Sequence, residues 1–219
     1  MTAHPKIYFV PGLGADRRLF MELRNEGLHF EVLEFIPHLK GESLRDYAHR
    51  LAAGIDASQP HILGGVSLGG MMATEIARIT QPEKLILIST VKNSREFPFY
   101  LKTFRYLPLY RLVSGRFLVR HAPRERRKNL LPAHADALDG MREDADPEFV
   151  KWAIGAVLNW RRGGQPEHAV HIHGTKDRLF PGWHMGERVR IKGGSHVMVL
   201  THAAEIVAKI RAHLASTGM

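Results

Sequence analysis

The sequence contains no cysteine, which excludes disulfides, thiolate nucleophiles and cysteine-based zinc sites. It also lacks any apolar run near the roughly 20 residues that a membrane helix needs. Its first residues show no apolar segment between a basic flank and a cleavage site, so we expect no signal peptide. Internal repeats and linker segments are absent too. These absences predict one soluble, cytoplasmic domain over residues 1–219, with the 44% hydrophobic and 24% charged residues of an ordinary globular protein.

Positive charge exceeds negative charge, and the excess is confined to one segment. The formal net charge is +9. Residues 91–130 contain eleven Lys and Arg but only two Glu, so this stretch accounts for the whole imbalance. Such a segment can face an anionic substrate, an anionic surface or only water.

Short apolar runs that are typical of buried strands alternate with helical patterns along the chain. We expect strands at about 6–10, 30–36, 61–66, 84–89, 169–173 and 187–191. We expect helices between these strands and a last helix at about 201–214. The alternation predicts an α/β fold with a mostly parallel sheet of about six strands and helices on both faces. Residues 91–165 are helical in pattern, without a convincing strand, and are expected to form an inserted helical cap.

The most informative segment is the one that joins the expected strand at 61–66 to the following helix. It has the pattern G-x-S-x-G, with Gly65, Ser67 and Gly69 at the fixed positions. A serine in so tight a turn adopts a strained backbone, and tiny neighbours avoid a clash with it. The turn would lift the Ser67 hydroxyl clear of the sheet and aim the N–H of Leu68 at an oxyanion formed there. The alternative is a plain glycine-rich turn.

A nucleophilic serine needs a base and a group that orients the base. Asp177 follows the expected strand at 169–173, and His196 follows the strand at 187–191. Active groups gather at the carboxyl ends of parallel strands, so both side chains are expected near Ser67. The chain order Ser, Asp, His belongs to one of three unrelated arrangements of this triad. The alternatives are a turn-capping aspartate and a surface histidine.

The second oxyanion donor is expected in the loop after the first strand. Gly12 and Gly14 in this loop let the backbone approach a bound ester oxygen closely. The N–H of Leu13 is the candidate donor. The alternative is a turn that only starts the next helix, with Asp16 as its cap.

With these segments in place, the chain resembles the α/β-hydrolase superfamily, in its small-esterase branch. The resemblance lies in PGLGAD, GVSLGG, GTKDRLFP and GGSHVMVL, and it spans nearly the whole length. It implies a Ser-Asp-His hydrolase with Ser67 as nucleophile, His196 as general base and Asp177 as its orienter, with Leu13 and Leu68 at the oxyanion positions. Three features depart from the family: Pro11-Gly12 replaces its usual His-Gly, its leading antiparallel hairpin is missing, and the cap is short.

The sequence therefore predicts a carboxylic-ester hydrolase that needs no cofactor or metal and acts on a small acyl substrate, an anionic one included. Thioesterase, lactonase, amidase, C–C hydrolase and perhydrolase activities use the same triad. A catalytically idle fold that binds a partner is the alternative from another class. The basic segment is expected to be a lid, with a membrane surface as the next option and nucleic acid the least favoured. His171 and His173 share one face of a strand, and a packed or hydrogen-bonded pair is expected there rather than a metal site. The oligomeric state is not predicted.

Overall fold

The computed structural model describes residues 5–122, 130–161 and 168–216, which form one sheet of six parallel strands. The strands are β1 (Lys6–Val10), β2 (Glu31–Val32), β3 (His61–Val66), β4 (Lys84–Ile88), β5 (Ala169–Gly174) and β6 (Val189–Ile191). Their order in the sheet is β2-β1-β3-β4-β5-β6. Every neighbouring pair is parallel, for example Gly65 of β3 opposite Leu87 of β4. The expected α/β fold with a parallel sheet is thus confirmed.

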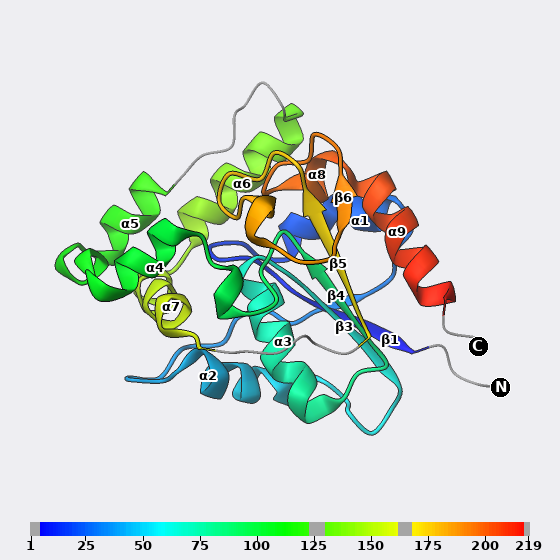
Figure 1. Cartoon of the computed structure of the whole chain (residues 1–219), viewed down its shortest axis with the longest axis horizontal. Coiled ribbons are helices and arrows are strands. Elements are labelled where there is room, and N and C mark those ends of the chain that lie inside the picture. Colours follow the sequence, from blue (N-terminus) through cyan, green and yellow to red (C-terminus); the bar gives the residue numbers. More distant parts are fainter. Residues whose placement is uncertain (1–4, 123–129, 162–167, 217–219) are drawn as a thin grey trace.

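Helices cover both faces of this sheet (Figure 1). They are α1 (Met21–Asn25), α2 (Leu44–Leu51), α3 (Leu68–Thr80), α8 (Met198–Thr201) and α9 (Ala203–Ala215). One face packs on α2 and α3, and the other on α1, α8 and α9. Strand β4 contributes to the core on both faces of the sheet. Leu85 and Leu87 point into the layer with α2 and α3, and Ile86 and Ile88 point into the layer with α1, α8 and α9. A strand buried on both faces has to be apolar throughout, as this one is.

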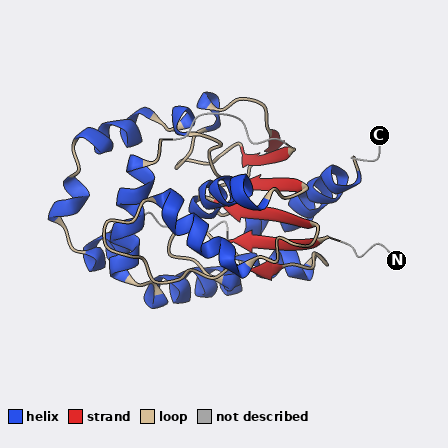
Figure 2. Ribbon diagram, turned by 90° about the horizontal axis from the view of Figure 1, so that it is seen from below, coloured by secondary structure: helices blue, strands red, loops and turns tan. Residues whose placement is uncertain are grey.

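The segment between β4 and β5 forms helices and, within its described residues, no strand. These helices are α4 (Phe99–Tyr106), α5 (Gly115–His121), α6 (Pro132–Asp144) and α7 (Pro147–Asn159). Figure 2 shows the strands pointing toward the end of the molecule where these helices lie. We call residues 91–165 the cap and treat its role as an insertion as a prediction. Its basic residues Arg124, Arg126, Arg127 and Lys128 lie outside the described residues.

Two helices begin where their sequences predict. Ser43 caps α2, and its hydroxyl accepts a hydrogen bond from the Asp46 N–H at 3.2 Å. Asp146 caps α7, with Pro147 as the first helical residue, and its carboxylate accepts from the Glu148 N–H at 2.9 Å. Each cap satisfies a backbone N–H that has no partner inside the helix.

The second strand is much shorter than the expected run at 30–36. Only Glu31–Val32 pairs with the edge of β1. Beyond it, the Tyr47 hydroxyl donates to the carbonyl of Ile36 at 2.8 Å and accepts from the Ile36 N–H at 2.9 Å. These bonds take the place of ladder bonds and hold the chain against α2. The apolar pattern is therefore correct about burial here and wrong about strand length.

Candidate active site

Ser67 sits in the turn between β3 and α3 with φ 54° and ψ −118°, a strained conformation for a residue with a side chain. The end of the neighbouring strand β4 forms hydrogen bonds with both the N–H and the carbonyl of Ser67. The Ser67 N–H donates to the carbonyl of Ile88 at 3.0 Å. The Thr90 hydroxyl donates to the carbonyl of Ser67 at 2.6 Å. The surrounding structure thus supports a backbone geometry that is unfavourable by itself.

Gly65 and Gly69 stand where no larger residue fits. A Cβ on Gly65 would lie 2.2 Å from the carbonyl oxygen of Gly69. A Cβ on Gly69 would lie 2.1 Å from the carbonyl oxygen of Val10. Both obstacles are backbone atoms, which cannot swing aside as a side chain would. The start of α3 can therefore pack against β1 and β3 only because these two residues lack side chains.

The structure brings Ser67, Asp177 and His196 together in one hydrogen-bonded chain. His196 Nε2 lies 3.0 Å from Ser67 Oγ, and His196 Nδ1 lies 2.9 Å from Asp177 Oδ2. Asp177 follows β5 and His196 follows β6, so all three side chains meet at the carboxyl end of the sheet. A carboxylate only accepts hydrogen bonds, which places the hydrogen of neutral His196 on Nδ1. Nε2 is then free to accept the hydroxyl hydrogen of Ser67.

The Asp177 carboxyl is buried yet kept ionised. Burial raises its pKa, but the electrostatic interaction and hydrogen bond with His196 and the N–H of Phe180 outweigh burial and hold the pKa below its ordinary value. Asp177 Oδ1 accepts from the N–H groups of Leu179 and Phe180 at 2.9 Å each. With Oδ1 fixed by the backbone, Oδ2 is aimed at the imidazole of His196.

Two buried histidines of β5, His171 and His173, lie beneath the Ser67–His196–Asp177 hydrogen-bonded chain and support it from inside the protein. His173 Nε2 lies 2.8 Å from the carbonyl of Phe180 and 3.4 Å from Asp177 Oδ2. A carbonyl accepts, so His173 carries its hydrogen on Nε2. Burial lowers the pKa of His173 and keeps the ring neutral. Each of the two histidines is hydrogen-bonded to a backbone carbonyl, His171 to that of Thr90 and His173 to that of Phe180. Among the described residues no group of three His, Asp or Glu is placed to hold a metal ion.

His171 supports the serine turn rather than the aspartate. Its Nε2–H donates to the carbonyl of Thr90 at 2.9 Å, and Thr90 in turn donates to Ser67. Thr90 was not predicted as a site residue from the sequence. Its signal was its place directly after the end of β4, at the edge of the sheet where the other site residues lie.

Leu13 and Leu68 belong to the two backbone segments next to Ser67, the loop after β1 and the start of α3. A Cβ on Gly12, the neighbour of Leu13, would lie 3.6 Å from the Cβ of Ser67. Leu68 is the first residue of α3, whose 13 residues direct the positive end of the helix dipole at this turn. Within the described chain, no hydrogen bond uses the N–H of Leu13 or of Leu68. Both loops thus bring unused backbone donors close to Ser67.

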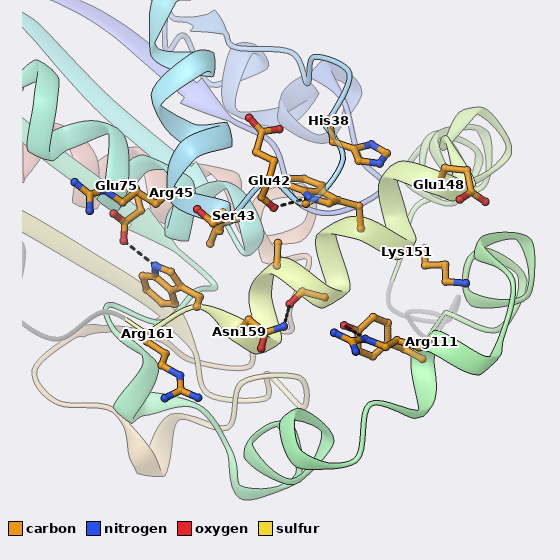
Figure 3. Close-up of a pocket in the computed structure, with 17 residues that line it drawn as sticks. His38, Glu42, Ser43, Arg45, Glu75, Arg111, Glu148, Lys151, Asn159 and Arg161 are labelled. Carbon is orange, nitrogen blue, oxygen red and sulfur yellow. Dashed lines mark hydrogen bonds between the residues drawn. The ribbon is translucent and has the colours of Figure 1, made fainter.

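A cavity of about 720 Å³ lies away from this chain of residues, between α2, α3 and α7 (Figure 3). Trp152 and Trp160 form part of its wall, where they donate to the carbonyl of Glu42 and to the carboxylate of Glu75. Its lining also mixes cationic and acidic side chains, namely Arg45, Arg111, Lys151 and Arg161 with Glu42, Glu75 and Glu148. None of the residues that line it is Ser67, Asp177 or His196, so this cavity is not the space above the serine.

Comparison with solved structures shows the same fold. The chain is 19% identical to a thermophilic esterase from Thermogutta terrifontis with malate bound, over 98% of this chain and 90% of that chain, with a TM-score of 0.71. It is 13% identical to a hydrolase from Pseudomonas aeruginosa PA01, over 97% of this chain and 90% of that chain, with a TM-score of 0.70. A search of curated proteins finds no significant match.

A family model agrees with the fold and with the motifs. Residues 6–209 match the model of the alpha/beta hydrolase family, which is nearly the whole of the described chain. The matched region contains the serine turn, the aspartate after β5 and the histidine after β6. The chain belongs to the alpha/beta hydrolase family.

Proposed function

We propose that this hydrolase cleaves carboxylic ester bonds with Ser67 as nucleophile, by way of an acyl-enzyme. The observation that carries the proposal is the unbroken chain from Ser67 Oγ through His196 to Asp177, with contacts of 3.0 and 2.9 Å. A serine hydroxyl becomes a useful nucleophile when a base stands within hydrogen-bond reach and a third group orients that base. Solved structures of the same fold include an esterase, which supports an ester as substrate.

The proposed reaction follows from these positions. His196 Nε2 takes the proton of Ser67 as Oγ attacks the ester carbonyl carbon. His196 then gives this proton to the alcohol oxygen as the carbon–oxygen bond breaks, which leaves the acyl group on Ser67. A water molecule, deprotonated by His196, attacks the acyl carbon and releases the acid, and the proton returns to Ser67. Asp177 stabilises the imidazolium that forms in both steps.

The negative charge on the carbonyl oxygen needs its own donors during both steps. We assign this role to the N–H groups of Leu13 and Leu68. Each such donor is typically worth about 3–4 kcal/mol to the transition state. A fixed backbone N–H is effective here because it does not have to reorient as the charge develops.

The charge of the cap bears on the acyl group. Lys92 at its start is buried and lies 3.8 Å from Glu96, whereas Lys102 on α4 is exposed. Exposed cations of the cap such as Lys102 favour an anionic acyl substrate. Added salt should then raise the KM of an anionic ester and leave that of a neutral ester unchanged. Equal responses would argue for a neutral substrate.

A cytoplasmic location stays a prediction from the sequence. None of the described helices is long and apolar enough to span a bilayer.

A fluorophosphonate probe and p-nitrophenyl esters of graded chain length test the proposal. The natural protein should take up the probe and release p-nitrophenol, and Ser67→Ala should do neither. Ser58→Ala is the matched control, because Ser58 is exposed in the loop before β3. Equal labelling of the Ser67→Ala protein, or an unchanged rate of ester hydrolysis, would overturn the assignment. Absence of labelling in the natural protein would favour an idle fold that binds a partner.

A further inference from the structure

Exposed apolar side chains are concentrated on one part of the cap. Thirteen large hydrophobic residues among the described ones are exposed, and eight of them fall between residues 99 and 117. We call these eight residues the apolar face: Phe99, Tyr100, Phe104, Tyr106, Leu107, Leu109, Leu112 and Phe117. Leu112 is 83% exposed, and Phe99 and Tyr106 are each 78% exposed. Single exposed leucines need no explanation, but a group this dense marks an interaction surface.

The charges interspersed with the apolar face are of one sign. The stretch from 97 to 122 contains five Lys and Arg and no Asp or Glu. Lys102, Arg111, Arg116 and Arg120 among them are exposed. The surface therefore combines exposed aromatic and aliphatic side chains with cations. The carboxylates that line one hollow together with Arg116 and Arg120 come from α6, namely Asp139 and Glu143.

Among the described residues of the cap, α4 and α5 leave this surface uncovered. α4 and α5 both pack on α7, which takes up their inner sides. Leu101 of α4 packs against the core, whereas Phe99 and Phe104 of the same helix remain exposed. One side of α4 thus packs against the protein, and the other side is exposed.

The apolar face reaches the rim of the candidate active site, by which we mean the loop at residues 178–188 that follows Asp177 and leads to β6. The Tyr100 hydroxyl donates to the carbonyl of Leu179, two residues after Asp177. Leu179 and Trp183 in this rim are themselves 37% and 77% exposed. Figure 1 shows α4 and α5 at the side of the molecule beyond the carboxyl ends of the strands. The rim and the apolar face therefore adjoin each other.

We propose that the apolar face docks on an anionic lipid surface, with its leucines and aromatic rings in the headgroup layer and its cations on the headgroups. Amphipathic cationic surfaces bind membranes in this way. A second copy of the chain fits less well, because two such faces would bring cations against cations. Nucleic acid fits less well too, because it would use the cations and rings but give Leu107, Leu109 and Leu112 nothing to bury against. The proposal stands whether or not Ser67 is a nucleophile.

Sedimentation with vesicles tests the apolar part of the proposal. The protein should bind vesicles that contain 30% phosphatidylglycerol in phosphatidylcholine and should not bind pure phosphatidylcholine. Leu109→Ser should weaken this binding about fivefold to tenfold, since a leucine that enters the lipid loses its transfer energy. Leu39→Ser is the matched control: both leucines are 55% exposed, but Leu39 lies outside the cap. Circular dichroism and the Tm check that each variant is folded.

Charge variants test the electrostatic part of the proposal, the contact of cations with the headgroups. Arg120→Gln should weaken binding to the anionic vesicles about fivefold, and Lys209→Gln on α9 should leave it unchanged. Raising the salt concentration should weaken binding of the natural protein. The proposal is wrong if neutral and anionic vesicles bind equally, or if Leu109→Ser and Leu39→Ser lose binding to the same extent. It is also overturned by a dimer that Leu109→Ser dissociates, or by tighter binding to a single-stranded oligonucleotide than to anionic vesicles.

Discussion

The buried His173 approaches the carboxylate of Asp177, with Nε2 3.4 Å from Oδ2. The same oxygen accepts from His196 Nδ1 at 2.9 Å. One carboxylate oxygen therefore faces two imidazoles, one inside the protein and one at the candidate site. The burial of His173 keeps it neutral, so it acts on Asp177 through its N–H group rather than through a full charge.

Removing the charge of Asp177 tests whether it orients His196. Asp177→Asn keeps the shape of the side chain, but its amide N–H can donate to His196 Nδ1. The imidazole is then held in the wrong tautomer, with its hydrogen on Nε2. We expect kcat for a p-nitrophenyl ester to fall by about 10⁴ with little change in KM. The exposed Asp136 on α6 provides a matched control, and Asp136→Asn should leave kcat unchanged. A fall in kcat of less than about tenfold for Asp177→Asn would contradict the role.

Replacing His173 tests its role as a positioning residue. His173→Leu removes the N–H that contacts Asp177 and the carbonyl of Phe180, so the aspartate can shift. We expect kcat to fall about tenfold with KM unchanged, because small displacements of a reacting group are costly. His173→Gln keeps a donor at about the same position and should restore most of the rate. If both variants lose stability equally and neither changes kcat, His173 has only a structural role.

The sequence identified the three central side chains because their type and their position agreed. Ser67, Asp177 and His196 each follow a strand that could be recognised by its apolar pattern, and parallel strands bring such positions to one edge. Thr90 also follows a strand, but a threonine there carries no specific chemical signal. Its hydrogen bond to the carbonyl of Ser67 depends on the neighbouring position of β3 and β4, which no local pattern specifies.

The histidines of β5 also show that a local sequence pattern does not specify long-range partners. Strand alternation places His171 and His173 on one face, and this much was predictable. Their different partners, Thr90 for one and Phe180 for the other, depend on how two loops fold back over the strand. The exposure of the apolar face likewise depends on which side of α4 packs on α7, and a helix with apolar residues on both sides leaves that choice open.

Removing the Thr90 hydroxyl tests the support of the serine turn. Thr90→Val has nearly the same shape, but it removes the 2.6 Å donor to the carbonyl of Ser67, to which the N–H groups of Gly70 and Met71 still donate. We expect a loss of about 0.5–1.5 kcal/mol in the free energy of unfolding, measured in urea, and a lower kcat. Thr90→Ser keeps the donor and should show a smaller loss on both counts. A Thr90→Val protein with unchanged stability and kcat would show that β3 and α3 alone hold the turn.

Adding one methyl group tests the close approach of α3 to β1. Gly69→Ala places a Cβ 2.1 Å from the carbonyl oxygen of Val10, so the helix or the strand has to move. We expect a loss of about 3 kcal/mol or more in the free energy of unfolding, together with loss of activity. Gly41→Ala is the control: its Cβ would meet nothing within 4 Å, and its φ of +75° should cost only about 1 kcal/mol. Similar losses for the two variants would contradict the clash.

Acid should destabilise the protein through His171. Burial, reinforced by the neighbouring His173, lowers the pKa of His171 to about 3, whereas an unfolded histidine titrates near 6.5. Between these two pH values the unfolded chain binds a proton that the folded chain does not. The stability that depends on neutral His171 is therefore complete above about pH 6.5 and falls by about 1.4 kcal/mol per pH unit below it.

His171→Gln isolates this contribution, because glutamine can donate to the carbonyl of Thr90 but does not titrate. Urea unfolding at pH 7.5 and pH 5.5 should show a stability difference about 1.4 kcal/mol smaller in the variant than in the natural protein. His29→Gln in the loop before β2 is the control, because this side chain is exposed. The variant should remove the proton uptake of the unfolded chain at this position without changing the surface exposed on unfolding, so the urea m-value should stay unchanged. An identical pH dependence in His171→Gln and the natural protein would mean that His171 accepts a proton in the folded chain, and the hydrogen bond from His171 to Thr90 would then not require a neutral ring.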